Sequence, residues 1–167
     1  ADIRRSQDLM TYSDPDEFAD NTVCFIKTTR NLIEKHAGFF DKFTGDGFVA
    51  YFNQTICEKV NKDYQDCFLS FIREEREFAD AHFKKWKKKV RKLSSTKIGL
   101  AIGADLGTVA FNNMQNHLVA VGAPIVWASR MASAAEANEL LVNNILYSAL
   151  EGTQDLSFED RSFQTKA

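Results

Sequence analysis

The spacing of hydrophobic and polar positions along the chain changes between a helical and a strand-like period, which predicts a mixed α and β structure. Apolar residues recur at helical spacing over residues 14–38, and their buried stripe is expected to contain Phe18, Thr22, Ile26 and Ile33. Asp14 and Pro15 are typical of a helix start and Gly38 of a helix end. A second helical region is expected from about Cys57 to Leu93.

Short aromatic or β-branched runs bounded by glycine or asparagine predict strands. The opening residues 1–3 are interpreted as the end of a strand, and residues 39–43 and 48–52 as the two arms of a hairpin. Further strands are expected at 97–103, 107–113, 117–121, 139–142 and 156–160, and helices at 124–138 and 143–152. This order predicts an α+β fold of the ferredoxin-like kind, with helices packed on a mostly antiparallel sheet.

Composition and charge fit an ordinary globular protein, with 44% hydrophobic and 26% charged residues in 167, and predict one domain over residues 1–167. A formal charge of −2 gives no general affinity for nucleic acid or acidic membranes. The basic run at 84–92 is interpreted as a solvated helix end rather than a nucleic-acid patch. The start without methionine indicates an excerpt of a longer protein.

The three cysteines, Cys24, Cys57 and Cys67, include no C-x-x-C pair, so neither a disulfide framework nor a zinc site is predicted. No apolar run reaches the length of a membrane span. The sequence therefore predicts a soluble protein of a reducing compartment, for which the cytoplasm is the simplest choice.

The candidate chemistry starts from Asp46, which stands between Gly45 and Gly47 at the tip of the predicted hairpin. Alone, this Gly-Asp-Gly is ordinary turn chemistry. However, Asp2 ends the first strand, and a hairpin that pairs beside this strand brings the two carboxylates together at one sheet edge. Converging carboxylates repel each other unless a cation neutralises them, and oxygen ligands select Mg²⁺ or Mn²⁺.

A metal site of this kind makes a phosphate substrate the expected ligand. Arg4, Arg5 and Ser6 follow Asp2 directly, together with a run of backbone N–H groups that suits a polyphosphate. The alternative for Arg4 and Arg5 is that they are surface residues.

Five segments in order resemble the catalytic domains of class III adenylate and guanylate cyclases, over nearly the whole chain. The sequences ADIRRSQDL at 1–9 and DKFTGDGFVAYF at 41–52 are similar to the two metal motifs of this family. KIGLAIGADLGTVAF at 97–111 is similar to the strand pair that follows them. The stretch at 119–150 is similar to the segment with base-reading and transition-state residues, and FEDRSFQTK at 158–166 to the terminal strand.

The resemblance implies two divalent metal ions, Mg²⁺ or Mn²⁺, held by Asp2, the backbone carbonyl of Ile3, and Asp46. It implies conversion of a nucleoside triphosphate to a 3′,5′-cyclic nucleotide and pyrophosphate. It also implies a head-to-tail homodimer with composite active sites. Arg130 matches the arginine that stabilises charge on the α-phosphate. Lys166 matches the terminal triphosphate-binding lysine with a slip of one residue.

The sequence departs from the family pattern at two positions to which the resemblance assigns contacts with the nucleotide. Val126 stands where the family has its transition-state asparagine, and Val119 where purine cyclases read the base with Asp, Thr or Cys. Lys42 matches the lysine that adenylate cyclases place on adenine, although its ammonium can equally donate to a pyrimidine carbonyl. Trp127 either fills the space of a smaller base or packs against the sheet, and packing is the preferred interpretation.

These departures favour a pyrimidine cyclase, because the family includes uridylate and cytidylate cyclases of bacterial antiphage signalling with altered base-reading positions. Lys42 favours the alternative of an ordinary adenylate cyclase. Val126 favours a second alternative from another class, a degenerate cyclase fold that binds nucleotide without turnover.

Overall fold

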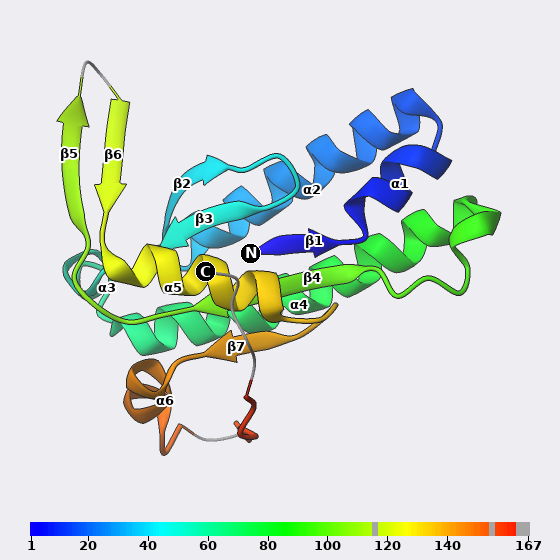
Figure 1. Cartoon of the computed structure of the whole chain (residues 1–167). Helices are drawn as coiled ribbons and strands as arrows, with labels where there is room; N and C mark the ends of the chain where they lie inside the picture. Colours follow the sequence, from blue (N-terminus) through cyan, green and yellow to red (C-terminus); the bar gives the residue numbers. More distant parts are fainter. Residues whose placement is uncertain (115–116, 154–155, 163–167) are drawn as a thin grey trace. The chain divides into compact units, whose positions relative to one another are not determined.

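The computed structural model describes residues 1–114, 117–153 and 156–162 (Figure 1). Contacts between residues divide the chain into two compact units, Ala1–Leu100 and Ala101–Ala167. Among the described residues, none of the helices combines the length and the apolar character that crossing a membrane requires.

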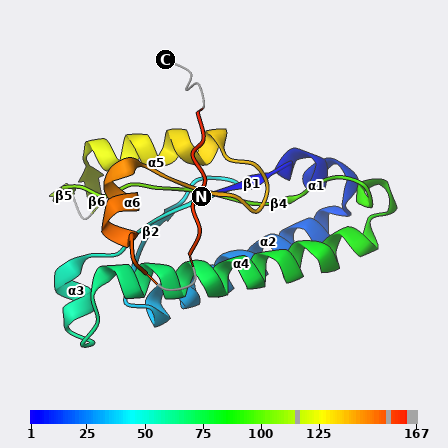
Figure 2. The same ribbon diagram turned by 90° about the horizontal axis from the view of Figure 1, so that it is seen from below.

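The first unit contains three short strands and most of the helical residues. Its elements are β1 (Asp2–Arg4), α1 (Ser6–Tyr12), α2 (Pro15–Lys35), β2 (Phe39–Phe43), β3 (Phe48–Tyr51), α3 (Gln54–Glu58), α4 (Tyr64–Lys89) and the 3₁₀ turn η1 (Arg91–Leu93). Strand β4 (Gly99–Ala104) starts at its end. The long helices α2 and α4 lie side by side in both views (Figures 1 and 2).

An aromatic core joins α2 to α4. The Phe25 ring lies 5.3 Å from that of Phe83, and the Phe18 ring lies 5.6 Å from that of Trp86. Phe25, Phe83 and Trp86 are at most 1% exposed, and burial of each side chain stabilises the fold by about 1.5–3 kcal/mol. The predicted helix start is confirmed, since the Asp14 carboxylate accepts hydrogen bonds from the first-turn N–H groups.

Three details of the first unit differ from the sequence prediction. Helix α1 was not expected. Of the predicted buried stripe of α2, Ile33 is buried, whereas Phe18, Thr22 and Ile26 are half-buried, and the other buried positions are Phe25 and Thr29. The second helical region is also divided into α3 and α4. Asn61 between them has a φ of 56°, which an α-helix does not accommodate, and Asp63 caps α4 by accepting from the Asp66 N–H.

The second unit places two strand pairs beside two helices. Its elements after β4 are β5 (Ala110–Met114), β6 (His117–Val121), α5 (Ala123–Ala134), β7 (Leu140–Val142) and α6 (Asn144–Leu150). Strands β5 and β6 form an antiparallel hairpin, whereas β4 and β7 are parallel, with Ile102 opposite Leu140.

Helix α5 packs very closely on β4. A Cβ atom at Gly103 would lie 2.1 Å from the Ala128 carbonyl oxygen, so glycine is required at this contact. The core beneath α5 consists of Ala101, Met131, Ala135 and Leu141. The helix ends at Ala134, four residues before its predicted end.

The prediction of a strand at 156–160 is wrong, because these residues form no regular strand. Side-chain contacts hold this segment instead of a backbone ladder. The Phe158 ring lies 5.2 Å from that of Tyr147, and Arg161 forms an ion pair with Glu139. The other predicted elements are present, and the predicted α+β class, with helices packed on sheets rich in antiparallel pairs, is confirmed.

Candidate active site

The tip of the β2–β3 hairpin is held against β1 by backbone contacts. The Ile3 N–H donates to the Asp46 carbonyl at 2.8 Å, and an antiparallel bridge joins Asp2 to Gly47. A Cβ at Gly47 would lie 2.2 Å from the Ala1 carbonyl oxygen, and Gly45 has a φ of 86°. Both glycines of the turn are therefore required, one for its conformation and one for the close approach of β1.

This contact brings together the two carboxyl groups that the sequence predicted to converge. Burial raises the pKa of Asp2, and the neighbouring charge of Asp46 raises it further. Arg4 opposes this shift, since its Nη1 lies 2.8 Å from Asp2 Oδ2. The Ser6 hydroxyl donates to Asp46 Oδ2 at 2.6 Å.

Burial and the neighbouring Asp46 carboxylate both disfavour the charged form of Asp2. A hard divalent cation suits such oxygen ligands. Within the described ranges, no group of three or more His, Cys, Asp or Glu side chains could hold a metal ion. Any metal here would therefore need further oxygens from backbone, substrate or water, and the carbonyl of Ile3, between Asp2 and Arg4, is adjacent to the pair.

A cavity of about 310 Å³ opens in front of the carboxylates. It is lined by Asp2, Ile3, Arg4, Arg5, Ser6, Gln7, Asp8 and Asp46. All six predicted metal and phosphate residues near the chain start and the hairpin thus lie around one space. Gln7 and Asp8 were missed, and their only signal in the sequence was that they directly follow Ser6.

Arg5 adopts a left-handed backbone conformation, with a φ of 65°, where α1 begins. For a residue other than glycine this conformation costs about 1–2 kcal/mol. The Arg5 side chain forms an ion pair with Asp8 on the first turn of α1. The strained residue is part of the cavity wall, and such strain is common where a backbone is shaped for a ligand.

Lys42 lies on the hairpin but does not line this cavity. A bulge in the β2–β3 register falls between Phe40 and Lys42. The Lys42 side chain is 62% exposed, and its ammonium lies 3.9 Å from the buried Asp41 carboxylate, which also accepts from the Tyr51 hydroxyl at 3.0 Å. Burial, with the Asp41 contact next, raises the pKa of Tyr51, so this hydroxyl remains a donor.

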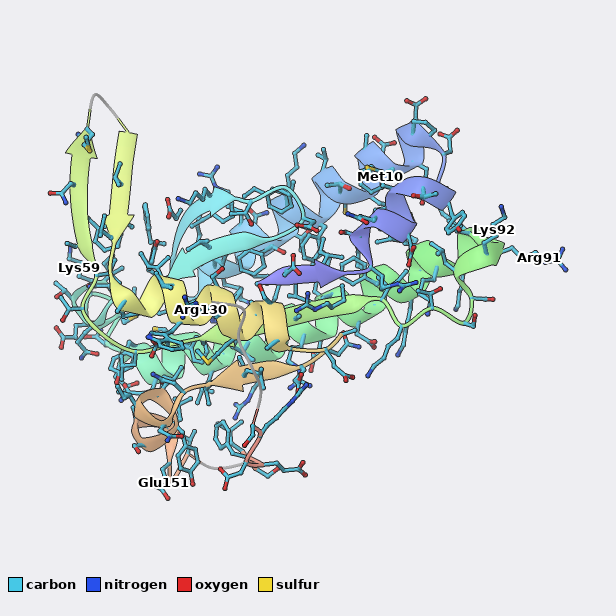
Figure 3. The ribbon with its side chains drawn as sticks, in the orientation of Figure 1. Met10, Lys59, Arg91, Lys92, Arg130 and Glu151 are labelled. Atoms are coloured by element: carbon cyan, nitrogen blue, oxygen red, sulfur yellow. The ribbon has the colours of Figure 1, made fainter. Side chains whose placement is uncertain are left out.

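The remaining predicted residues belong to the second unit. Val119 lies on β6 opposite Asn112 of β5. Val126 and Trp127 are 51% and 47% exposed on α5, so the interpretation that Trp127 packs against the sheet is wrong. The Arg130 guanidinium carbon lies 5.2 Å from the centre of the Trp127 ring, and Figure 3 shows Arg130 on α5. Lys166 lies outside the described residues.

The basic run at 84–92 forms the last turns of α4 and η1. Lys84 pairs with Asp80 and Lys89 with Glu17, while Trp86 and Val90 are buried. Arg91 extends outward at this end (Figure 3), and the Lys92 ammonium lies 5.1 Å from the centre of the Tyr12 ring. This arrangement agrees with a solvated helix end.

Neither the protein-family models nor the curated proteins compared with this chain give a match. Solved structures do. The adenylyl cyclase CyaB from P. aeruginosa has a TM-score of 0.72 at 24% identity, over 91% of this chain and 78% of that one. The guanylate cyclase domain of RhGC from Catenaria anguillulae, in complex with GTP, has a TM-score of 0.67 at 18% identity, over 90% and 79%.

A third similar structure is the non-canonical dimeric guanylyl cyclase domain of the RhoGC fusion protein from Blastocladiella emersonii, with a TM-score of 0.65 at 15% identity, over 90% and 79%. The chain therefore has the fold of class III adenylyl and guanylyl cyclase catalytic domains, as the sequence predicted. Because both adenylyl and guanylyl cyclases share this fold, the likeness does not distinguish between bases.

Proposed function

We propose that this chain is a nucleotidyl cyclase, which converts a nucleoside triphosphate to a 3′,5′-cyclic nucleotide and pyrophosphate. The observation that carries the proposal is the pair Asp2 and Asp46, which meet beside an arginine-lined cavity in a chain with the cyclase fold. Under this proposal residues 1–167 act as a single catalytic domain.

The cavity residues divide into two roles. Asp2, Asp46 and the Ile3 carbonyl would hold two divalent cations, Mg²⁺ or Mn²⁺, and the raised pKa of Asp2 fits a pair that a cation relieves. Bound metal would supply charge neutralisation for the attack of the ribose 3′-hydroxyl on the α-phosphorus and for the leaving pyrophosphate. Arg4, Arg5 and Ser6 bind and orient the triphosphate through their donors.

Arg130 is assigned to the α-phosphate, where its guanidinium stabilises the negative charge that builds during cyclisation. Lys166 is assigned to the triphosphate. The proposed assembly is a head-to-tail homodimer, in which one subunit contributes the carboxylates and its partner contributes the base-reading groups. A non-canonical dimer among the proteins of similar fold supports dimerisation as such, and the head-to-tail arrangement rests on the family resemblance.

For the base, we favour UTP or CTP. Val119 offers no side-chain hydrogen bond, and the exposed Lys42 ammonium can donate to a pyrimidine carbonyl. The product would then be a cyclic pyrimidine nucleotide, a messenger that suits antiphage defence in the cytoplasm. The alternative of an ordinary adenylate cyclase depends on the match of Lys42 to an adenine-reading lysine.

A degenerate, nucleotide-binding module is the candidate from a different class, and Val126 favours it. The convergence of Asp2 and Asp46 opposes it, because a site without metal or turnover has no need for two adjacent carboxylates, which cost stability.

Substitution of the carboxylates tests this function. Asp2→Asn and Asp46→Asn should each lower turnover at least about a hundredfold, because each removes a metal ligand without a change in shape. Asp80→Asn, an aspartate that pairs with Lys84 on α4, is the matched control and should retain activity. Activity above a tenth of wild type in either site variant would contradict the assignment.

A further inference from the structure

Arg130 is held by an aromatic ring rather than by a carboxylate. Its guanidinium carbon lies 5.2 Å from the centre of the Trp127 ring, three residues earlier on the same face of α5. Among the described residues, no carboxylate forms an ion pair with Arg130, and the Trp127 ring is the contact recorded for its guanidinium. The two side chains therefore form an isolated cation–π pair.

The fold itself does not require a tryptophan at this position. Trp127 is 47% exposed, and the residues of α5 that enter the core of the second unit are Met131 and Ala132. A large aromatic side chain that is half in solvent contributes little to this core. Its contact with Arg130 is then the interaction that a smaller residue could not replace.

A ring is also a suitable support for an arginine that must bind phosphate. A guanidinium above a ring uses its flat face, whereas its five N–H donors lie in its plane and remain available to phosphate oxygens. A carboxylate partner would occupy those donors and compete with the substrate. The contact can therefore restrict the Arg130 rotamers without loss of donor capacity.

We propose that Trp127 is a positioning residue, which holds the Arg130 guanidinium ready for the α-phosphate of the substrate. This inference rests on the proposed function, because it assumes the role of Arg130. The neighbouring Val126, which cannot donate a hydrogen bond, makes this positioning more important. Because Val126 replaces the asparagine that donates a hydrogen bond in the family, Arg130 has to supply a larger share of the stabilisation of the transition-state charge. Displacement of its guanidinium therefore lowers the rate more than it would if the asparagine were present.

A double-mutant cycle on purified protein tests the proposal, with cyclic product measured for each of the four nucleoside triphosphates. Trp127→Leu should lower kcat about three- to thirtyfold with little change in KM, because a cation–π contact has this strength. Trp127→Phe keeps a ring and should recover most of the loss. Arg130→Ala should lower kcat at least about a hundredfold, and addition of Trp127→Leu to it should have no further effect.

Tryptophan emission provides a readout that does not depend on turnover. Arg130→Ala should change the emission in the wild-type background and leave it unchanged in the Trp127→Leu background, where only the buried Trp86 remains. Ile145→Ser, which removes an apolar side chain 61% exposed on α6, is the matched control and should alter neither kcat nor emission.

The outcomes separate this inference from the proposed function. Wild-type kcat in Trp127→Leu together with an inactive Arg130→Ala would overturn the positioning role and leave the cyclase proposal intact. Additive losses in the double variant would mean that Trp127 acts on the substrate or the fold and not through Arg130. Full activity in Arg130→Ala would overturn both the positioning role of Trp127 and the assignment of Arg130 to the α-phosphate, whereas absence of cyclic product from the wild-type protein would overturn the cyclase proposal.

Discussion

Glu75 of α4 provides a quantitative test of how the first unit is packed. Its side chain is fully buried, with Oε1 accepting from the Thr29 hydroxyl at 2.8 Å. Its Oε2 has no hydrogen-bond partner among the described residues. Burial raises the pKa of Glu75 to about 8, against an opposing contribution from the Thr29 hydrogen bond.

The direction of the stability change follows from proton binding. Between about pH 4.5 and 8 the folded state keeps a proton on Glu75 that the unfolded state has released. The free energy of unfolding should therefore fall as pH rises, by about 1.4 kcal/mol per pH unit, or about 5 kcal/mol across the window. This contribution is fully present below the unfolded pKa and is lost as pH rises through the folded pKa.

Glu75→Gln removes this titration and keeps the side-chain shape and an acceptor for Thr29. Wild type and Glu75→Gln are unfolded with urea at pH values from 4.5 to 9. The free energy of unfolding of the variant relative to that of wild type should rise by about 3 kcal/mol between pH 4.5 and 7. Glu77→Gln, at an exposed position of the same helix, should follow wild type throughout. If the difference in free energy of unfolding between Glu75→Gln and wild type stays constant from pH 4.5 to 8, the reasoning is refuted.

Three further predictions concern the site. In metal-free buffer Asp46→Asn should raise the melting temperature, because it removes a charge that opposes ionisation of Asp2. Addition of Mn²⁺ should raise the melting temperature of wild type but not that of Asp46→Asn. A lower melting temperature of the variant without metal, together with a rise in Mn²⁺ for the variant and none for wild type, would contradict a metal-binding pair. A mixture of Asp46→Asn and Arg130→Ala subunits should regain activity that neither variant has alone, because one of the two sites in a mixed dimer then carries neither substitution. If activity does not recover although subunit exchange is demonstrated, each site is built within one chain. Lys42→Ala should lower kcat/KM for the preferred triphosphate about tenfold and so reduce the ratio of this kcat/KM to the values for the other triphosphates. An equal loss of kcat/KM for all four triphosphates would exclude base reading by Lys42.

The hairpin and the carboxylate pair could be predicted because their signals are local. Gly45 and Gly47 restrict the turn, and the aromatic runs on either side predict the strands, so the position of Asp46 follows from a short stretch. Its approach to Asp2 depended on one long-range assumption, that the hairpin pairs beside the first strand, and the structure confirms it.

Other features depended on information that periodicity does not carry. Helix α1 follows a left-handed Arg5 and has no side-chain cap, so its start left no signal in the sequence. The exposure of Trp127 was also not predictable, since the same residue would be buried if α5 were rotated on β4. The close approach of α5 at Gly103 fixes that rotation, and only the packed structure reveals it.

The most direct measurement of the central claim is the product formed from each nucleoside triphosphate. The purified protein is incubated with Mn²⁺ and ATP, GTP, UTP or CTP in turn, and the products are identified by mass. The account predicts a 3′,5′-cyclic monophosphate and pyrophosphate, with UTP or CTP used better than ATP or GTP. A highest kcat/KM for ATP would contradict the pyrimidine preference. Triphosphate binding with no cyclic product from any of the four would contradict the cyclase itself.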